Sequence, residues 1–133
     1  MLTRREEREQ AFILLFEKSF NEEVTVSDLY EMAVENEIIS ESDFAKNLAL
    51  KVTENIEVID AAVEKHSVKW KMSRISKVAL AVMRLAICEI LFYDDIFVGV
   101  SINEAVELCK KYASKDDYSF VNGILSAIAK EER

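Results

Sequence analysis

Proline is absent from this chain of 133 residues, and glycine occurs only twice. Sheet-rich folds, whether sandwiches or doubly wound sheets, use proline and glycine at their many turns, so this scarcity argues against both classes. A chain of this length buries about two thirds of its unfolded surface, which is enough for one hydrophobic core. These absences favour a single all-helical domain.

Cysteine and histidine are almost as scarce. Cys88 and Cys109 lie in segments with helical apolar spacing and match no zinc or redox motif, so we expect buried thiols in a reducing cytoplasm. His66, at the end of a predicted helix, has no nucleophile pattern around it, and we interpret it as a solvated residue. Glycine-rich phosphate loops and metal-ligand spacings are also missing. The sequence therefore predicts a protein that is not an enzyme and holds no cofactor or metal.

Apolar runs of about 18 residues, the length of a membrane span, are missing too, and the N-terminus opens with charged residues. We expect a cytoplasmic protein without membrane contact. The net charge is −8, but residues 1–66 carry 7 basic and 16 acidic side chains, whereas residues 67–133 carry 10 and 9. A local basic patch acts within roughly 10 Å at moderate salt, so the net charge does not exclude nucleic acid.

The sequence does contain segments in which apolar residues recur at helical spacing, and capping residues precede these segments. Thr3 with Glu6 forms a capping-box pattern, and Ser101 with Glu104 forms another, unless that helix begins one turn earlier. We predict six to seven helices, since the segment 40–66 is either one helix or two broken near Asn55. The expected helices are Thr3–Phe20, Ser27–Asn36, Ser40–His66, Ser73–Tyr93, Ser101–Tyr112 and Tyr118–Lys130.

Three arginines lie in the first two turns of the first predicted helix. Arg8 shares a helix face with Arg4 or Arg5 at steps of three and four residues, and such a face suits phosphate groups. Three glutamates interleave with them, so an exposed first turn of mixed charge is the alternative.

The start of the last predicted helix carries Tyr118, Phe120 and Asn122. Aromatic rings at such a position can stack on unpaired bases, and an amide can read a base edge. The alternative for Phe120 is a place in the core. Gly123 costs about 1 kcal/mol relative to alanine inside a helix, which predicts the close approach of a neighbouring helix or a ligand. The predicted helix Ser73–Tyr93 is apolar almost all round, so it is either central or docks a partner.

Several short motifs stand in a fixed order along the chain. They are Arg4-Arg5, Arg8-Glu9-Gln10-Ala11, Asn55, Ile59-Asp60, Trp70, Arg74, Arg84-Leu85-Ala86, Glu89, Ile102-Asn103-Glu104-Ala105-Val106-Glu107-Leu108 and Phe120-Val121-Asn122-Gly123. In this order and spacing the chain resembles the NusB family of transcription antitermination proteins over essentially its whole length. The resemblance implies one all-helical domain, residues 1–133, of two packed helical subdomains at about 1–68 and 69–133.

The function that this resemblance implies is a non-enzymatic adaptor in the cytoplasm. Family members pair with NusE, a protein of the small ribosomal subunit, and bind the single-stranded boxA element of nascent RNA. The complex joins elongating RNA polymerase with NusA and NusG and suppresses termination, notably in ribosomal RNA operons. The resemblance assigns RNA contacts to Arg4, Arg5, Arg8, Phe120 and Asn122, with Tyr118 beside them. It assigns the NusE side to Met83, Arg84 and Ile87.

Departures from the family pattern leave alternatives. Ala79-Leu80 replaces a common acid-base pair, and Phe97 and Gly99 replace a proline and a basic residue. Arg84 and Glu89 equally suit ion pairs between helices. The chain is therefore either an RNA-binding adaptor or a helical module that binds only proteins, including a homodimer with a masked RNA face. The similar helical domain that precedes some RNA cytosine methyltransferases is a remote third possibility, because 133 residues leave no room for the enzyme.

Overall fold

The computed structural model describes residues 1–68 and 70–132, and in these ranges all regular structure is helical. The all-helical prediction is confirmed. In chain order the elements are α1 (Arg4–Phe20), α2 (Val26–Glu35), α3 (Asp43–Glu54), α4 (Ile56–His66), the short 3-10 helix η1 (Met72–Arg74), α5 (Lys77–Phe92), α6 (Val98–Tyr112) and α7 (Lys115–Glu132).

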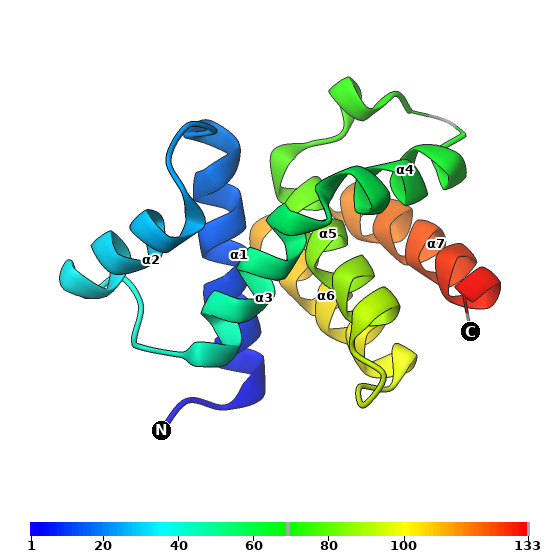
Figure 1. Ribbon diagram of the computed structural model, residues 1–133. Coiled ribbons are helices and arrows are strands. Elements are labelled where there is room, and N and C mark those ends of the chain that lie inside the picture. Colours follow the sequence, from blue (N-terminus) through cyan, green and yellow to red (C-terminus); the bar gives the residue numbers. More distant parts are fainter. Residues whose placement is uncertain (69, 133) are drawn as a thin grey trace.

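Helix α5 lies at the centre of the molecule. It packs against α1 and α3 on one side, α4 at its start, and α6 and α7 on the other side (Figure 1). Ten of its 16 residues are buried, which explains why its sequence is apolar on nearly every face. Of the two alternatives for this helix, the central one is confirmed, and α5 joins helices from both halves of the chain.

Local capping explains where the helices begin. The capping box at Thr3 is confirmed, because its hydroxyl accepts from the Glu6 amide at 3.1 Å and its own amide donates to the Glu6 carboxylate at 2.9 Å. Three other predicted starts are wrong by two or three residues. The hydroxyls that accept from a first-turn amide belong to Thr25, Ser42 and Ser76 rather than to Ser27, Ser40 and Ser73.

The structure decides two further boundaries that the sequence left open. Helix α6 begins at Val98, one turn before Ser101, so Ser101 is a buried helical residue and the predicted capping box does not form. The segment 40–66 is two helices, as one of the two alternatives had it. Asn55 separates them and its side-chain amide donates to the Lys51 carbonyl at 2.9 Å.

The cysteines and the histidine differ in how well they were predicted. Cys88 and Cys109 are buried and free, as expected, and burial raises the pKa of each thiol to about 12. His66 is the last residue of α4, but it is half-buried rather than solvated. Its ring nitrogens lie 2.8 Å from the Glu131 carboxylate and 3.0 Å from the Ala62 carbonyl, which ties α4 to the end of α7.

Gly123 does not mark a close helix contact. A Cβ atom added there meets nothing within 4 Å, and the residue is exposed on α7. The prediction of a neighbouring helix at this position is therefore wrong. No helix in the described ranges is long and apolar enough to cross a membrane. Within the same ranges, no three histidine, cysteine or carboxylate side chains gather as a metal site.

Candidate nucleic-acid interface

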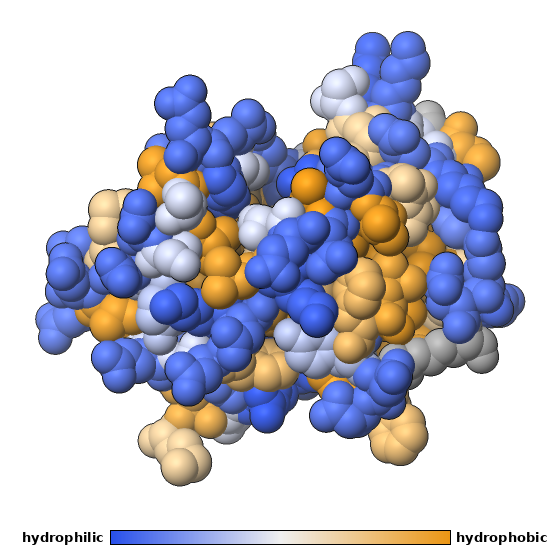
Figure 2. Space-filling model, viewed as in Figure 1, coloured by the Kyte–Doolittle hydropathy of each residue, from blue (hydrophilic) through white to orange (hydrophobic). Residues whose placement is uncertain are grey.

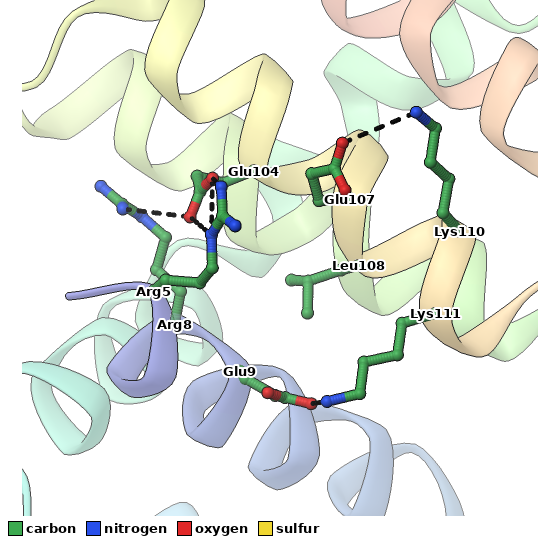
Figure 3. A pocket seen from close by; sticks show the side chains of 8 residues that line it. All are labelled: Arg5, Arg8, Glu9, Glu104, Glu107, Leu108, Lys110 and Lys111. Atoms are coloured by element: carbon green, nitrogen blue, oxygen red, sulfur yellow. Dashed lines mark hydrogen bonds and ion pairs between the residues drawn. The ribbon is translucent and has the colours of Figure 1, made fainter. Parts of the chain in front are cut away.

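A groove of about 330 Å³ runs between α1 and α6, and charged side chains line it (Figure 3). Its residues are Arg5, Arg8, Glu9, Glu104, Glu107, Leu108, Lys110 and Lys111. Helix α1 supplies the first three and α6 the other five, so the N-terminal arginines meet the acidic stretch of α6 in space. The groove therefore gathers four basic and three acidic side chains in one place.

Arg8 is the buried member of this set. Its guanidinium donates from Nε to Glu89 of α5 at 2.7 Å, and the Ser101 hydroxyl donates to the other oxygen of that carboxylate at 2.7 Å. The Arg8 side chain is 6% exposed and that of Glu89 is 0% exposed. The structure therefore corrects the predicted phosphate contact of Arg8. A buried charge needs its partner, and Arg8 with Glu89 forms the ion pair that joins α1 to α5.

Arg5 lies at the mouth of the same groove. It donates from Nε to both oxygens of Glu104 at 3.0 and 3.2 Å, and from Nη2 at 2.8 Å. The Arg5 side chain is 66% exposed, whereas that of Glu104 is 11% exposed. The hydrogen bond to Glu104, followed by its charge, raises the pKa of Arg5. Arg5 is thus a cation that reaches solvent while a nearly buried carboxylate holds one edge of it.

Arg4 is exposed next to these residues. Its guanidinium carbon lies 3.8 Å from the centre of the Phe44 ring, and its Nη1 lies 3.6 Å from Glu7. A guanidinium that lies over a ring can still donate its N–H groups outward in its own plane. Arg4 therefore belongs to the accessible basic surface that begins α1.

The far end of the groove is closed by lysines of α6. Lys111 donates to Glu9 of α1 at 2.6 Å, and the Tyr112 hydroxyl donates to the same oxygen. Burial raises the pKa of Glu9, but the hydrogen bonds from Lys111 and Tyr112 outweigh it and leave the pKa lowered. Lys110 lies 3.6 Å from Glu107 and 5.6 Å from the centre of the Tyr118 ring. A lysine of the groove thus lies next to an aromatic ring at the start of α7.

The three residues predicted on α7 do not form one cluster. Tyr118 and Asn122 are four residues apart and share a face next to α6, whereas Phe120 points to another side of the helix. Tyr118 is half-buried and Asn122 is exposed. Phe120 is packed against the core and lines a separate groove of about 200 Å³. The other residues of that groove are Trp70, Arg74, Ile75, Ser76, Asp116 and Asp117.

The predicted partner residues are divided by burial. Met83 and Ile87 are both 0% exposed, so their assignment to a partner surface is wrong, and they are core residues of α5. Arg84 lies on the outer side of α5 and donates to both oxygens of Asp60 in α4, at 2.9 Å each. The alternative of an ion pair between helices is confirmed for Arg84 and also for Glu89.

A surface beside Arg84 does expose apolar groups. A groove of about 360 Å³ there is lined by Leu15, Lys18, Ser19, Glu22, Val52, Thr53, Ile56 and Arg84. Phe20, at the end of α1, is 59% exposed, and the Lys77 ammonium of α5 lies 5.0 Å from its ring centre. In the view of Figure 2, hydrophilic side chains cover most of the face and apolar ones gather mainly over α5 and α7. Apolar area on this face is thus confined to patches.

The model of the NusB family matches residues 5–130 of the chain. This chain belongs to the NusB family. It is 44% identical over 126 residues to the transcription antitermination protein NusB of Clostridium acetobutylicum, which covers 93% of both proteins. The structure of T. maritima NusB is similar with a TM-score of 0.86 at 34% identity, covering 98% of this chain and 92% of the other.

A further similar structure contains antitermination factors NusB and NusE in complex with dsRNA. Its TM-score is 0.85 at 32% identity, and the match covers 96% of each chain. The resemblance inferred from the motifs is therefore confirmed for the whole chain, and the NusB fold accounts for the seven helices described above.

Sequence reasoning missed the acidic half of the groove in this NusB-family chain. Glu104 and Glu107 stand in the quoted Ile102–Leu108 motif. The pair of Glu104 with Arg5 of α1 appears only in the folded chain, whereas Glu107 pairs with Lys110 one turn along its own helix. Lys110 and Lys111, which follow the motif directly, were the available signal for a basic stretch on the last turn of α6. Trp70 also stood in a motif, and the structure places it beside Phe120.

Proposed function

We propose that this NusB-family chain is a transcription antitermination factor without catalytic activity. It pairs with NusE and binds boxA-type single-stranded RNA. The assembly acts with NusA and NusG on elongating RNA polymerase and limits termination, notably in ribosomal RNA operons. The observation that carries the proposal is a row of exposed cations, Arg5 on α1 and Lys111 and Lys110 on α6, the last of which lies over the half-exposed ring of Tyr118 on α7.

Single-stranded RNA needs two kinds of contact. Arginine and lysine hold phosphates, and aromatic rings stack on splayed bases. Arg4 and Arg5 supply the first kind at one end of the surface, and Lys110 beside Tyr118 supplies both at the other end. Asn122 lies one turn beyond Tyr118 on the same face, where its amide suits a base edge.

The similarity to a NusB bound with NusE and RNA supports both partners. For the NusE side we propose the surface between the end of α1 and the start of α5, which includes Phe20, Lys77 and Arg84. It replaces the assignment to Met83 and Ile87, which are buried. Phe20 offers an exposed ring, and Lys77 and Arg84 add charge at its edge. Helices α1–α4 and α5–α7 correspond to the two expected subdomains in this proposal.

The second candidate function is a module that binds only proteins, including a copy of itself. It is favoured by the pairing of each basic side chain in the α1–α6 groove with a carboxylate, which lowers the net charge available to RNA. The two candidates make opposite predictions for a boxA-like single strand, because only the adaptor binds it through Arg5 and Tyr118.

The test measures binding of a boxA-like single-stranded RNA by the chain alone and by its complex with NusE. Arg5→Ala and Tyr118→Ala each weaken binding by about tenfold, as expected for a phosphate contact and a stacked base. Lys46→Ala is the control. It removes a cation of α3 that lies outside the groove, and it leaves binding unchanged. If both groove variants bind as tightly as the unmodified complex, the proposed RNA surface is wrong.

A further inference from the structure

The basic side chains of the α1–α6 groove are matched by carboxylates. The pairs are Arg5–Glu104, Arg8–Glu89, Lys110–Glu107 and Lys111–Glu9, at shortest nitrogen–oxygen distances of 2.8, 2.7, 3.6 and 2.6 Å. Figure 3 shows three of these pairs around Leu108, with the pairs at Arg5 and Lys111 crossing between helices. A groove that gathers four cations therefore presents little net positive charge to a polyanion.

Arg5 and Glu104 form the pair in which an exposed cation is held by a nearly buried anion. The Nε edge of Arg5 is used by both oxygens of Glu104, while the side chain is 66% exposed. Glu104 also lies 4.0 Å from Arg8 Nη1, so it keeps a cationic neighbour if Arg5 moves away. The structure thus lets Arg5 leave the pair without leaving a buried carboxylate alone.

We infer that Glu104 competes with RNA phosphate for Arg5 and so restrains RNA binding. This inference rests on the proposed function, because it concerns the same groove. Glu104 occupies the Nε–H of Arg5 and one N–H of its Nη2, so a phosphate gains these two donors only when the guanidinium gives up Glu104. Solvent reaches the exposed Arg5 side of this ion pair and weakens it, so the restraint lowers RNA affinity by about two- to fivefold.

Competition between Glu104 and phosphate makes RNA binding more selective rather than tighter. An unpaired basic groove attracts any polyanion, because charge steering does not depend on sequence. When each phosphate contact must replace an internal carboxylate, less of the binding free energy comes from charge and more comes from contacts with bases. Tyr118 and Asn122, at the end of the same surface, are placed to supply those contacts.

The experiment measures boxA-like RNA binding by the NusE complex for Glu104→Gln, with and without Arg5→Ala. Glu57→Gln is the control, since it removes one exposed negative charge on α4, outside the groove, and frees neither Arg5 nor Lys110. We expect Glu104→Gln to bind about two- to fivefold more tightly. In the Arg5→Ala background the same substitution gains no more affinity than Glu57→Gln does.

Three outcomes separate the possibilities. Weaker or unchanged binding by Glu104→Gln overturns the inference and leaves the proposed function standing. An equal gain with and without Arg5 also overturns it, because the effect is then general electrostatics. Absence of binding by every form, including the unmodified complex, overturns the proposed function itself and this inference with it.

A second measurement covers the case in which Glu104→Gln fails to fold. In the unmodified complex, the NMR signal of the Arg5 Nε–H reports the hydrogen bond to Glu104 directly. Addition of saturating RNA moves this signal if phosphate replaces the carboxylate. A signal that stays in place at saturation contradicts the competition.

Discussion

Arg8 donates a 2.7 Å hydrogen bond from α1 to the fully buried carboxylate of Glu89 in α5, across 81 positions of sequence. Ser101 of α6 donates to the same carboxylate, so three helices meet at one buried anion. Removal of one partner from a buried ion pair leaves an uncompensated charge, which costs more than the pair contributes.

Arg8→Ala is therefore expected to lower the free energy of unfolding by about 3–5 kcal/mol. Denaturant unfolding followed by circular dichroism measures this loss. The double variant Arg8→Met with Glu89→Leu serves as the control, because it removes both charges and is expected to lose less stability. A loss under about 1 kcal/mol for Arg8→Ala contradicts the structural role of the pair.

Gly123→Ala is expected to stabilise the fold by about 1 kcal/mol, because the position lies inside α7 and a Cβ meets nothing within 4 Å. The melting temperature measures the gain. Gly99, which also has open space around a Cβ, lies in the first turn of α6, so its change to alanine is a matched control with a smaller expected effect. A lower melting temperature for Gly123→Ala is incompatible with the open space found there.

Stability is expected to fall as the pH rises above about 9. The folded chain holds the thiols of Cys88 and Cys109 protonated to a pKa of about 12, chiefly because of burial, whereas ordinary thiols ionise near 9.0. The unfolded state therefore binds fewer protons between these values and gains free energy from ionisation. Burial also raises the pKa of Tyr93 to about 12, which steepens the loss above pH 10.

Unfolding curves between pH 8 and 11 test this dependence. Replacement of both cysteines by alanine flattens the slope above pH 9, whatever it does to stability at pH 8. A slope that is unchanged in the double variant assigns the alkaline loss to other groups.

Phe20→Ala is expected to weaken the complex with NusE by at least about tenfold, since exposed aromatic side chains dominate binding at interfaces. The fold tolerates the change, because the Phe20 side chain is 59% exposed. Phe97→Ala is the control: this ring is 83% exposed at the turn between α5 and α6, away from the proposed NusE surface. Calorimetry with purified NusE gives both affinities, and an equal loss for the two variants rejects the surface.

The fold was predictable from the sequence where the deciding interactions are local. The Thr3 capping box lies within four residues, and the apolar character of α5 is continuous along the chain. The start of α6 was not fixed by its own sequence, since Ser101 matches a cap but is buried against Glu89 from another helix. Ser40 and Ser42 are both possible caps of α3 in the sequence. Only the structure shows that the Ser42 hydroxyl is the one that accepts from the Ala45 amide.

The site was predictable in its residue types and less so in its geometry. Arg5 and Arg8 are three residues apart, yet one is exposed and one is buried, because Glu89 lies opposite only Arg8. Met83 and Arg84 are neighbours in sequence, but a rotation of one residue places the first in the core and the second outside. Such differences depend on the angle at which helices pack, which single-sequence patterns do not give.

The central position of α5 has a consequence for synthesis of the chain. Helices α1, α3 and α4 all pack against α5, which follows them in sequence and ends at Phe92. During translation, the parts of their apolar faces that α5 covers stay exposed until α5 has left the ribosome. Helices α6 and α7 then close the opposite side of α5, and α6 completes the groove with α1.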